Sequence, residues 1–185
     1  MIWNRKVVNV SLKNLQKRNS TVSQDITNAL LKLMKKQNFN EITIVDIVNE
    51  AKVGRVSFYR NFSSKEDVIK KYLDEITINF MKESQIHIYR DDLKKFLTIL
   101  FTHLKNNFDF ANVLLKANII HFVEDEFDKM FSRNIVNYKT AYSSYFFSGG
   151  VYKVYYYWLS NGCIETPEEI ANIVVSFFKK KGNSN

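Results

Sequence analysis

Apolar residues recur along most of the chain with the three- and four-residue spacing of amphipathic helices. From residue 21 onward, the pattern predicts a first helix that Thr21 caps and that ends near Asn38. Its apolar stripe consists of Ile26, Ala29, Leu30, Leu33 and Met34. One proline and five glycines in 185 residues leave little material for a series of hairpin turns. We therefore expect an all-α protein.

Further helical patterns continue to the end of the chain. They cover residues 64–80, 93–104, 113–120 and 137–160, and apolar residues at 127–131 extend the series. Asn161 and Gly162 make a good C-cap for the long aromatic helix. Thr166 can then cap a last helix, with Pro167 in its first turn and Glu169 at the third position.

Two short segments in the first half predict a helix-turn-helix. The stretch from Ile42 to Val48 is rich in β-branched residues and resembles a strand in composition. We interpret it as a helix that ends near Ala51, because Thr43 and Asp46 form a helix-start signal and no partner strand is evident nearby. A second short helix, 55–62, follows after about three residues, which is the spacing of a DNA-binding helix-turn-helix at residues 43 to 62. Its inner face is expected to contain Ile44, Ile47, Val48, Ala51, Val53, Phe58 and Phe62.

The positive charge is concentrated at the same end of the chain. Residues 1–70 contain 13 Lys or Arg and six Asp or Glu, a net charge of +7, whereas residues 71–185 contain 14 and 13, a net charge of +1. Such a basic end fits a polyanion, with nucleic acid the first candidate, although charge alone fits a solvated basic face equally well. The arm of residues 1–20 either reaches a minor groove or remains a disordered, merely attractive tail.

Other function classes find little support. The single cysteine, Cys163, excludes an internal disulfide and fits a reducing cytoplasm. No apolar run approaches the roughly 18 residues of a membrane span, and we expect no signal peptide. His121, Glu124 and Asp125 have helical spacing, but no Cys or second His lies near them in sequence, so we predict no metal site and no cofactor. Without a glycine-rich phosphate loop or a nucleophile motif, we expect no enzyme.

The most specific motifs surround the helix-turn-helix. They are Phe39, Thr43-Ile44-Val45-Asp46-Ile47-Val48, Ala51-Lys52-Val53-Gly54, Phe58-Tyr59-Arg60-Asn61-Phe62 and Ser64-Lys65-Glu66-Asp67. This set resembles the TetR/AcrR (tetracycline repressor) family of transcriptional regulators over about 45 residues, from Thr21 to Val68. Two departures stand out: Lys52 replaces the usual turn glycine, and Gly54 replaces the usual capping serine. Glycine is a tolerable N-cap, so we expect the fold to survive and the affinity for DNA to be affected by the lost hydroxyl.

The resemblance implies roles for individual residues. The positions that typically contact phosphates are Thr43, Ser57, Tyr59, Asn61 and Lys65. Such contacts position a protein on DNA without reading its sequence. The positions that typically face base edges are Arg55, Val56 and Arg60. An arginine there can donate two hydrogen bonds to a guanine, worth about 1–3 kcal/mol of discrimination.

The resemblance also implies a regulatory domain that dimerises through its last two helices. Residues 145–171 resemble a regulatory-domain subtype of this family seen in Firmicute members. Gly149 and Gly150 inside a helix each cost about 1 kcal/mol relative to alanine, so they mark either the close approach of another helix or an internal kink. We predict a four-helix dimer interface that contains Gly149, Gly150, Tyr152, Tyr156, Ile173, Val174 and Phe177.

An effector pocket is expected among residues 93–135, where phenylalanines cluster. Our candidate ligand-binding residues are Phe96, Phe101, Phe122 and Phe127. Aromatic stripes at helical spacing are as typical of plain core, so the sequence names no ligand. A protein co-regulator remains an alternative to a small molecule.

Together these patterns predict a two-domain, all-α, cytoplasmic homodimer. The expected parts are a basic arm (1–20), the helix-turn-helix domain (21–66), a helical regulatory and dimerisation domain (67–181) and a tail (182–185). We expect a repressor of a palindromic double-stranded operator that an effector releases. The alternatives are an activator that works with a protein co-regulator, and a helical ligand carrier or interaction module without a DNA role.

Overall fold

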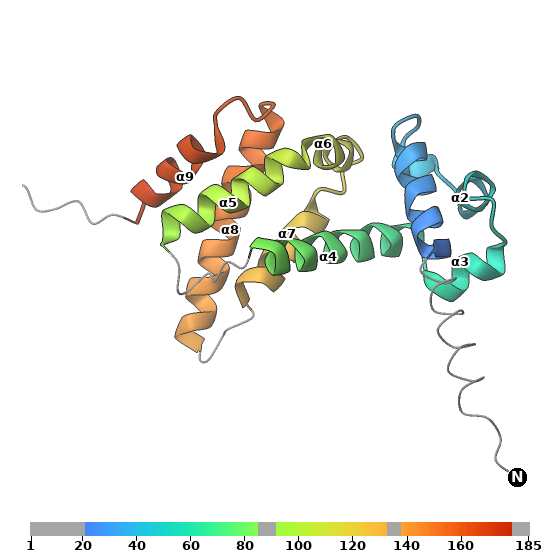
Figure 1. The fold of residues 1–185 in the computed structure, drawn as a ribbon, viewed down its shortest axis with the longest axis horizontal. Helices are drawn as coiled ribbons and strands as arrows, with labels where there is room; N and C mark the ends of the chain where they lie inside the picture. The colour runs from blue at the N-terminus through green and yellow to red at the C-terminus, as the bar shows by residue number, and fades with distance from the viewer. Residues whose placement is uncertain (1–20, 85–91, 133–137, 179–185) are drawn as a thin grey trace, which may run out of the picture. The chain divides into compact units, whose positions relative to one another are not determined.

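The computed structural model describes residues 21–84, 92–132 and 138–178, and all regular secondary structure in these ranges is helical (Figure 1). The predicted all-α class is therefore confirmed. The expected arm at 1–20, the tail at 182–185 and the lysines at 179–181 lie outside the described residues. The chain divides into two compact units between Tyr72 and Leu73. This division lies within helix α4 (Lys65–Ser84), as does the boundary at residue 66 that the sequence suggested.

The N-terminal unit begins with a helix that is described from residue 21 to residue 34. Thr21 is already helical, so the prediction that it caps this helix is wrong. The end was also predicted too late, near Asn38. Asn38 instead caps the short 3-10 helix η1 (Phe39–Glu41), where its side chain accepts a hydrogen bond from the Asn40 amide at 3.2 Å. The chain must therefore leave the first helix before Asn38.

Two short helices complete this unit before α4 starts. They are α2 (Ile44–Glu50) and α3 (Arg55–Asn61), which pack against each other. The β-branched segment is thus helical, as predicted. The core between these elements is almost entirely apolar, with Thr27 as a buried polar residue. Its best-buried members are Ile26, Leu30, Ile47, Phe58, Val68 and Ile69, each with none of its surface exposed. Of the expected inner face, Val48 and Phe62 are also buried, whereas Ile44, Ala51 and Val53 are half-buried.

The C-terminal unit contains the rest of α4 and five further helices. They are α5 (Leu93–Asn106), α6 (Phe108–Lys116), α7 (His121–Ser132), α8 (Tyr138–Ser160) and α9 (Pro167–Ser176). Helix α5 packs against α9, and α8 packs against both α7 and α6. The pattern expected at 113–120 runs past the end of α6, because the chain turns at Asn118, whose φ of 58° breaks the helix.

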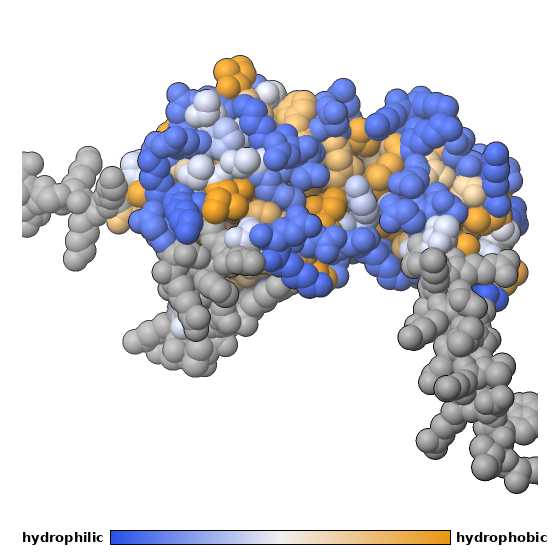
Figure 2. All heavy atoms as spheres, viewed as in Figure 1, coloured by the Kyte–Doolittle hydropathy of each residue, from blue (hydrophilic) through white to orange (hydrophobic). Residues whose placement is uncertain are grey.

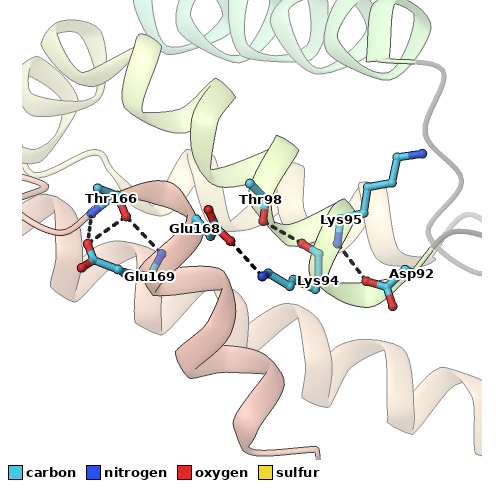
Figure 3. A network of polar contacts seen from close by, with 7 residues as sticks. All are labelled: Asp92, Lys94, Lys95, Thr98, Thr166, Glu168 and Glu169. Carbon is cyan, nitrogen blue, oxygen red and sulfur yellow. Dashed lines mark hydrogen bonds and ion pairs between the residues drawn. The ribbon is translucent and has the colours of Figure 1, made fainter.

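The junction between α8 and α9 follows the sequence signals closely. Gly162 has a φ of 77°, and its amide donates to the Leu159 carbonyl at 3.0 Å. The next amide, of Cys163, donates to the Trp158 carbonyl at 2.9 Å, which completes a Schellman C-cap. Thr166 and Glu169 then form a reciprocal capping box at the start of α9 (Figure 3). Both predicted helix ends are confirmed.

Polar contacts cap the starts of α5 and α9, and one ion pair joins the two helices (Figure 3). Lys94 donates to the Glu168 carboxylate at 2.8 Å, and Asp92 caps α5 by accepting from the Lys95 amide at 3.1 Å. Lys94 and Glu168 are both well exposed, so their pair contributes little, about 0–1 kcal/mol. Hydrophilic side chains cover most of the face of the unit drawn in Figure 2, with small apolar areas between them. Most of the stability must therefore come from the apolar core.

Candidate DNA-binding site

A reciprocal capping box fixes the start of α2. The Asp46 amide donates to Thr43 Oγ1 at 3.2 Å, and Asp46 Oδ2 accepts from the Thr43 amide at 2.8 Å and from Thr43 Oγ1 at 2.7 Å. These hydrogen bonds from Thr43, chiefly the side-chain bond, lower the pKa of Asp46. The Thr43 side chain is exposed, but its hydroxyl proton is already donated to Asp46. A phosphate contact by this hydroxyl would have to replace that bond.

The turn between α2 and α3 contains one strained residue. Lys52 has a φ of 55°, the left-handed conformation that glycine adopts without a steric cost. The Val53 amide closes the turn by donating to the Val48 carbonyl at 3.0 Å. The departure seen in the sequence, lysine at a turn glycine, therefore keeps the turn geometry at a steric cost of about 1–2 kcal/mol.

Helix α3 presents a continuous outer surface. Gly54 caps it through the backbone alone, as expected from the sequence, and Phe58 anchors it with none of its side chain exposed. At 100° per residue, Arg55, Val56, Tyr59 and Arg60 fall within about 140° of the helix circumference. All four are exposed, Val56 by 73% and Tyr59 by 61%. A valine and a tyrosine so exposed between two arginines form a surface suited to the edges and methyl groups of bases.

The other two predicted α3 contacts lie beside this surface. Ser57 and Asn61 are half-buried, and the Asn61 side-chain amide donates to the Ser57 carbonyl at 2.7 Å. Neither points as fully outward as the two arginines, which is consistent with contacts to the DNA backbone rather than to bases.

Helix α4 holds the end of α3 through a network that the sequence analysis missed. Lys71 Nζ donates to the Asn61 carbonyl at 2.8 Å and lies 5.1 Å from the centre of the Phe62 ring. Asp67 pairs with the same ammonium at 3.1 Å and accepts from the Ser63 amide at 2.8 Å. Burial raises the pKa of Asp67, but these bonds outweigh it and the net shift is downward. The i,i+4 spacing of Asp67 and Lys71 was the available signal.

Lys65 has a structural role in this arrangement. Its ammonium donates to the carbonyls of Phe39 at 2.6 Å, Asn40 at 3.1 Å and Ile42 at 2.8 Å. It also lies 4.6 Å from the centre of the Phe39 ring. Lys65 therefore ties the start of α4 to η1, and the phosphate contact implied by the resemblance would have to compete with these bonds.

Lys32 on the first helix makes a second link that sequence reasoning missed, through an ion pair with Glu50 at the end of α2. The hydrogen bond from Lys32 is the main reason that the pKa of Glu50 is lowered. Together with Lys71 and Lys65, this pair holds α2 and α3 in a fixed relation to the rest of the unit.

The structure separates the predicted interface residues of the C-terminal unit into two groups. Tyr156, Ile173 and Phe177 are exposed, by 38%, 45% and 68%. Tyr152 and Val174 are only 2% exposed, so both are already buried within the protomer and have no surface to offer a partner. Burial, with smaller effects from nearby groups, raises the pKa of Tyr152 to about 12.

The two glycines of α8, predicted to lie at a dimer interface, have open space beside them among the described residues. Helix α8 runs through both positions without a break. A Cβ added at Gly149 or Gly150 would meet no atom of the described residues within 4 Å. Among the described residues, no element therefore approaches either glycine closely.

Three of the four candidate ligand residues form plain core. Phe96 and Phe101 have no exposed surface and pack edge-on against Phe131 and Trp158, at centroid distances of 5.8 and 5.6 Å. Phe122 is also buried and packs edge-on against the ring of His121, at a centroid distance of 4.4 Å. Phe127 is the exception, since it borders an internal cavity between α4 and α8.

The described residues contain neither a metal-binding cluster nor a membrane-spanning helix. Within the ranges that the structure describes, no group of three or more His, Cys, Asp and Glu residues is placed to hold a metal ion. Among the helices of the same ranges, none combines the length and hydropathy that crossing a bilayer requires.

Comparisons with known proteins identify both units. Residues 26–72 match the family described as "Bacterial regulatory proteins, tetR family", and residues 91–180 match "Transcriptional regulator C-terminal region", the TetR_C_8 family. No curated protein sequence matches the chain.

Several solved structures share the fold. A TetR transcriptional regulator from Streptococcus agalactiae 2603V aligns with a TM-score of 0.65 and 18% identity, over 91% of this chain and 99% of that one. A putative TetR-family regulator from Syntrophomonas wolfei gives 0.58 and 20%, over 86% and 93%. The dihydroxyacetone kinase operon activator DhaS gives 0.57 and 15%, over 84% and 93%. The helix-turn-helix and the outward arginines of α3 agree with both family matches. The chain therefore belongs to the TetR family of DNA-binding transcriptional regulators.

Proposed function

We propose that this regulator binds a palindromic operator as a homodimer, with the outer surface of α3 in the major groove of each half-site. The observation that carries the proposal is the arrangement of Arg55, Val56 and Arg60, which are exposed together above the buried anchor Phe58. Arg55 and Arg60 read base edges, and Val56 contacts an apolar base edge such as a thymine methyl. Two such helices in a dimer would dock about 34–36 Å apart, in successive major grooves.

The phosphate contacts in this proposal come from residues beside the reading surface. Tyr59, Ser57 and Asn61 lie on α3 next to the arginines, and Thr43 is exposed at the start of α2. Lys65 adds positive charge near the phosphates of the DNA while its ammonium remains hydrogen-bonded to η1. These contacts position the protein and add a salt-dependent, sequence-independent part of the affinity.

The dimer in this proposal forms through α8 and α9. A groove of about 390 Å³ runs between these helices and is lined by Lys153, Tyr157, Ile170 and Ile173, among others. Tyr156, Ile173 and Phe177 supply exposed apolar surface, and Gly149 and Gly150 leave room for a helix of the second copy. Tyr152 and Val174 are left out, because both are buried within the protomer.

We further propose a repressor that an effector releases, acting in the cytoplasm by binding alone and without catalysis. A ligand can change operator binding only if it binds one conformation better than the other. A second candidate is activation, with a protein co-regulator in place of a small molecule. It is favoured by one observation: the structurally similar DhaS is named as an operon activator.

The experiment is fluorescence anisotropy of the protein on DNA from its own upstream region and on scrambled DNA, across a salt series. Arg55→Ala and Arg60→Ala should each weaken binding to the upstream DNA by about 1–3 kcal/mol and reduce the preference for it over the scrambled DNA. Lys35→Ala, which removes an exposed charge outside α3, is the matched control and should leave the preference unchanged.

Equal binding to both DNAs, abolished by salt and insensitive to the arginine variants, would overturn the operator proposal and leave only a polyanion surface. The dimer is tested separately by sedimentation. Ile173→Asp, which places a charge on the exposed apolar face, should yield monomers, whereas Asn172→Asp on the same helix should not. Transcription from the upstream region with and without the protein then decides between repressor and activator.

A further inference from the structure

The C-terminal unit encloses a cavity of about 50 Å³, which helices from α4 to α8 line together. A site for one water needs roughly 10–15 Å³ on this measure, so the cavity can hold a molecule of a few heavy atoms. Its wall is mostly apolar, with Phe80, Phe110 and Phe127 among the lining residues. One of the few polar residues in the wall is a carboxylate, Glu126 on α7.

Glu126 is unusual because only half of its carboxylate is paired. The residue is 5% exposed, and its Oε1 accepts from Lys129 Nζ at 2.6 Å. Its other oxygen, Oε2, is buried and has no hydrogen-bond partner among the described residues. A buried acceptor left without a donor costs free energy, more so when it carries charge, and a ligand that supplies a donor recovers that cost.

The charges around Glu126 favour a cation over a neutral donor. Lys129 is shared, since its ammonium also donates to Asp74 Oδ1 at 3.3 Å. Bonds to the two carboxylates, first of all the one to Glu126, raise the pKa of Lys129, so this ammonium remains charged. By formal count, two carboxylates stand against one ammonium in this group. A positively charged ligand would complete the balance.

The histidine of the wall does not add a competing cation, and the remaining polar residues there, Thr77, Asn107 and Tyr155, carry no positive charge. His103 on α5 lines the same cavity, and its ring lies 4.3 Å from the ring of Phe80. Burial lowers the pKa of His103, which favours the neutral imidazole. The aromatic rings of the wall suit an alkylammonium ion as well, because aromatic faces attract cations.

We infer that this cavity is the effector site and that it takes a small organic amine in its protonated form, whose ammonium donates to Glu126 Oε2. This inference rests on the proposed function, because it assigns the effector of the proposed regulator. The ligand's short apolar body would lie against Phe80, Phe110 and Phe127. Of the four phenylalanines that the sequence suggested, only Phe127 belongs to this site.

The test uses three probes with the same carbon skeleton: n-butylammonium chloride, n-butanol and sodium n-butyrate, at matched ionic strength. Calorimetric titration of the full-length protein should detect butylammonium, with butanol weaker and butyrate without effect. Glu126→Gln keeps the shape of the side chain and removes its charge, so it should weaken butylammonium binding about tenfold or more. Glu124→Gln, on the same helix but outside the cavity wall, is the matched control and should bind like the wild type.

Equal binding of all three probes, or unchanged butylammonium binding by a folded Glu126→Gln variant, would overturn the inference. The probe series on the wild type still decides if the variant does not fold, which circular dichroism checks. Operator binding is measured on the same samples. If the wild type does not bind the operator in the absence of any probe, the proposed function is wrong, whatever the amine does. If the wild type binds the operator but does not bind butylammonium, only the proposed effector site is wrong.

Discussion

In the N-terminal unit, the side chains to which we assign base contacts lie on the outer surface of α3. In the C-terminal unit, Glu126, to which we assign effector binding, lies in the interior. On α3 the functional surface and the core are separate faces of one seven-residue helix, with Arg55 and Arg60 outside and Phe58 inside. On α7, Glu126 is 5% exposed and lies next to Phe127, which is 2% exposed. Function and core therefore share one face there.

This difference decides which kind of substitution is informative in each unit. Surface changes on α3 should alter DNA binding and leave the fold intact, so the role of each residue can be measured by itself. Near Glu126 a substitution alters binding and packing together, and only isosteric changes separate the two effects.

The largest expected effect tests how sharply α3 separates its two faces. Phe58→Ala removes a fully buried ring and should destabilise the N-terminal unit by about 3–5 kcal/mol. Val56→Ala, two residues away and 73% exposed, should change stability by less than about 0.5 kcal/mol. Hydrogen exchange of amides in α2 and α3 measures both. Similar losses in the two variants would contradict the separation of faces.

The difference between an outer surface on α3 and an interior site on α7 also explains how much of each unit the sequence predicts. The spacing of apolar residues and the capping residues were sufficient to predict where α2, α3 and α9 begin. The caps Thr43, Gly54 and Thr166 act within one turn of their helices. The outward residues of α3 were predictable too, since a short helix with a buried Phe58 has only one free side.

Contacts between distant segments were not predictable in this way. The three carbonyls bound by Lys65 lie 23 to 26 positions away, and Tyr152 packs against the ring of Phe127 on another helix. Lys129, which binds Glu126, also binds Asp74, 55 positions away. The first helix was predicted to end near Asn38, whereas Asn38 caps the next element. Without knowledge of packing, a phenylalanine that lines a cavity, such as Phe127, cannot be told from one in solid core, such as Phe96.

A second, smaller effect concerns caps in the C-terminal unit. Thr166→Ala removes the capping box of α9 and should destabilise this unit by about 0.5–2 kcal/mol. Thr98→Ala is the matched control, because Thr98 only donates to the Lys94 carbonyl within α5 and alanine favours helix. Urea unfolding followed by the fluorescence of Trp158, which is buried in this unit, measures both. A loss for Thr98→Ala as large as that for Thr166→Ala would show that the cap is not the cause.

The third effect has the opposite sign and lies in the turn of the helix-turn-helix. Lys52→Gly relieves the left-handed backbone at φ 55° and should stabilise the N-terminal unit by about 1 kcal/mol. Lys36→Gly, in a turn whose φ is not positive, should destabilise instead, because glycine adds freedom to the unfolded chain. Hydrogen exchange in α2 reports both changes. Destabilisation by Lys52→Gly would mean that the lysine side chain makes a contact worth more than the strain.

The smallest effect returns to the interior of the C-terminal unit and depends on pH. Burial lowers the pKa of His103 below 6.5 in the folded protein, against a smaller opposing effect of Glu83. Well above pH 6.5 the imidazole is neutral in both states and contributes no pH dependence. As the pH falls below 6.5, the unfolded chain binds a proton that the folded chain resists, so the stability of this unit should decline. His103→Gln removes the titrating group and should flatten the decline between pH 6.5 and 5.5, measured by urea unfolding with Trp158 fluorescence. A decline of the same slope in the variant would assign the pH dependence to other groups and leave His103 without a part in it.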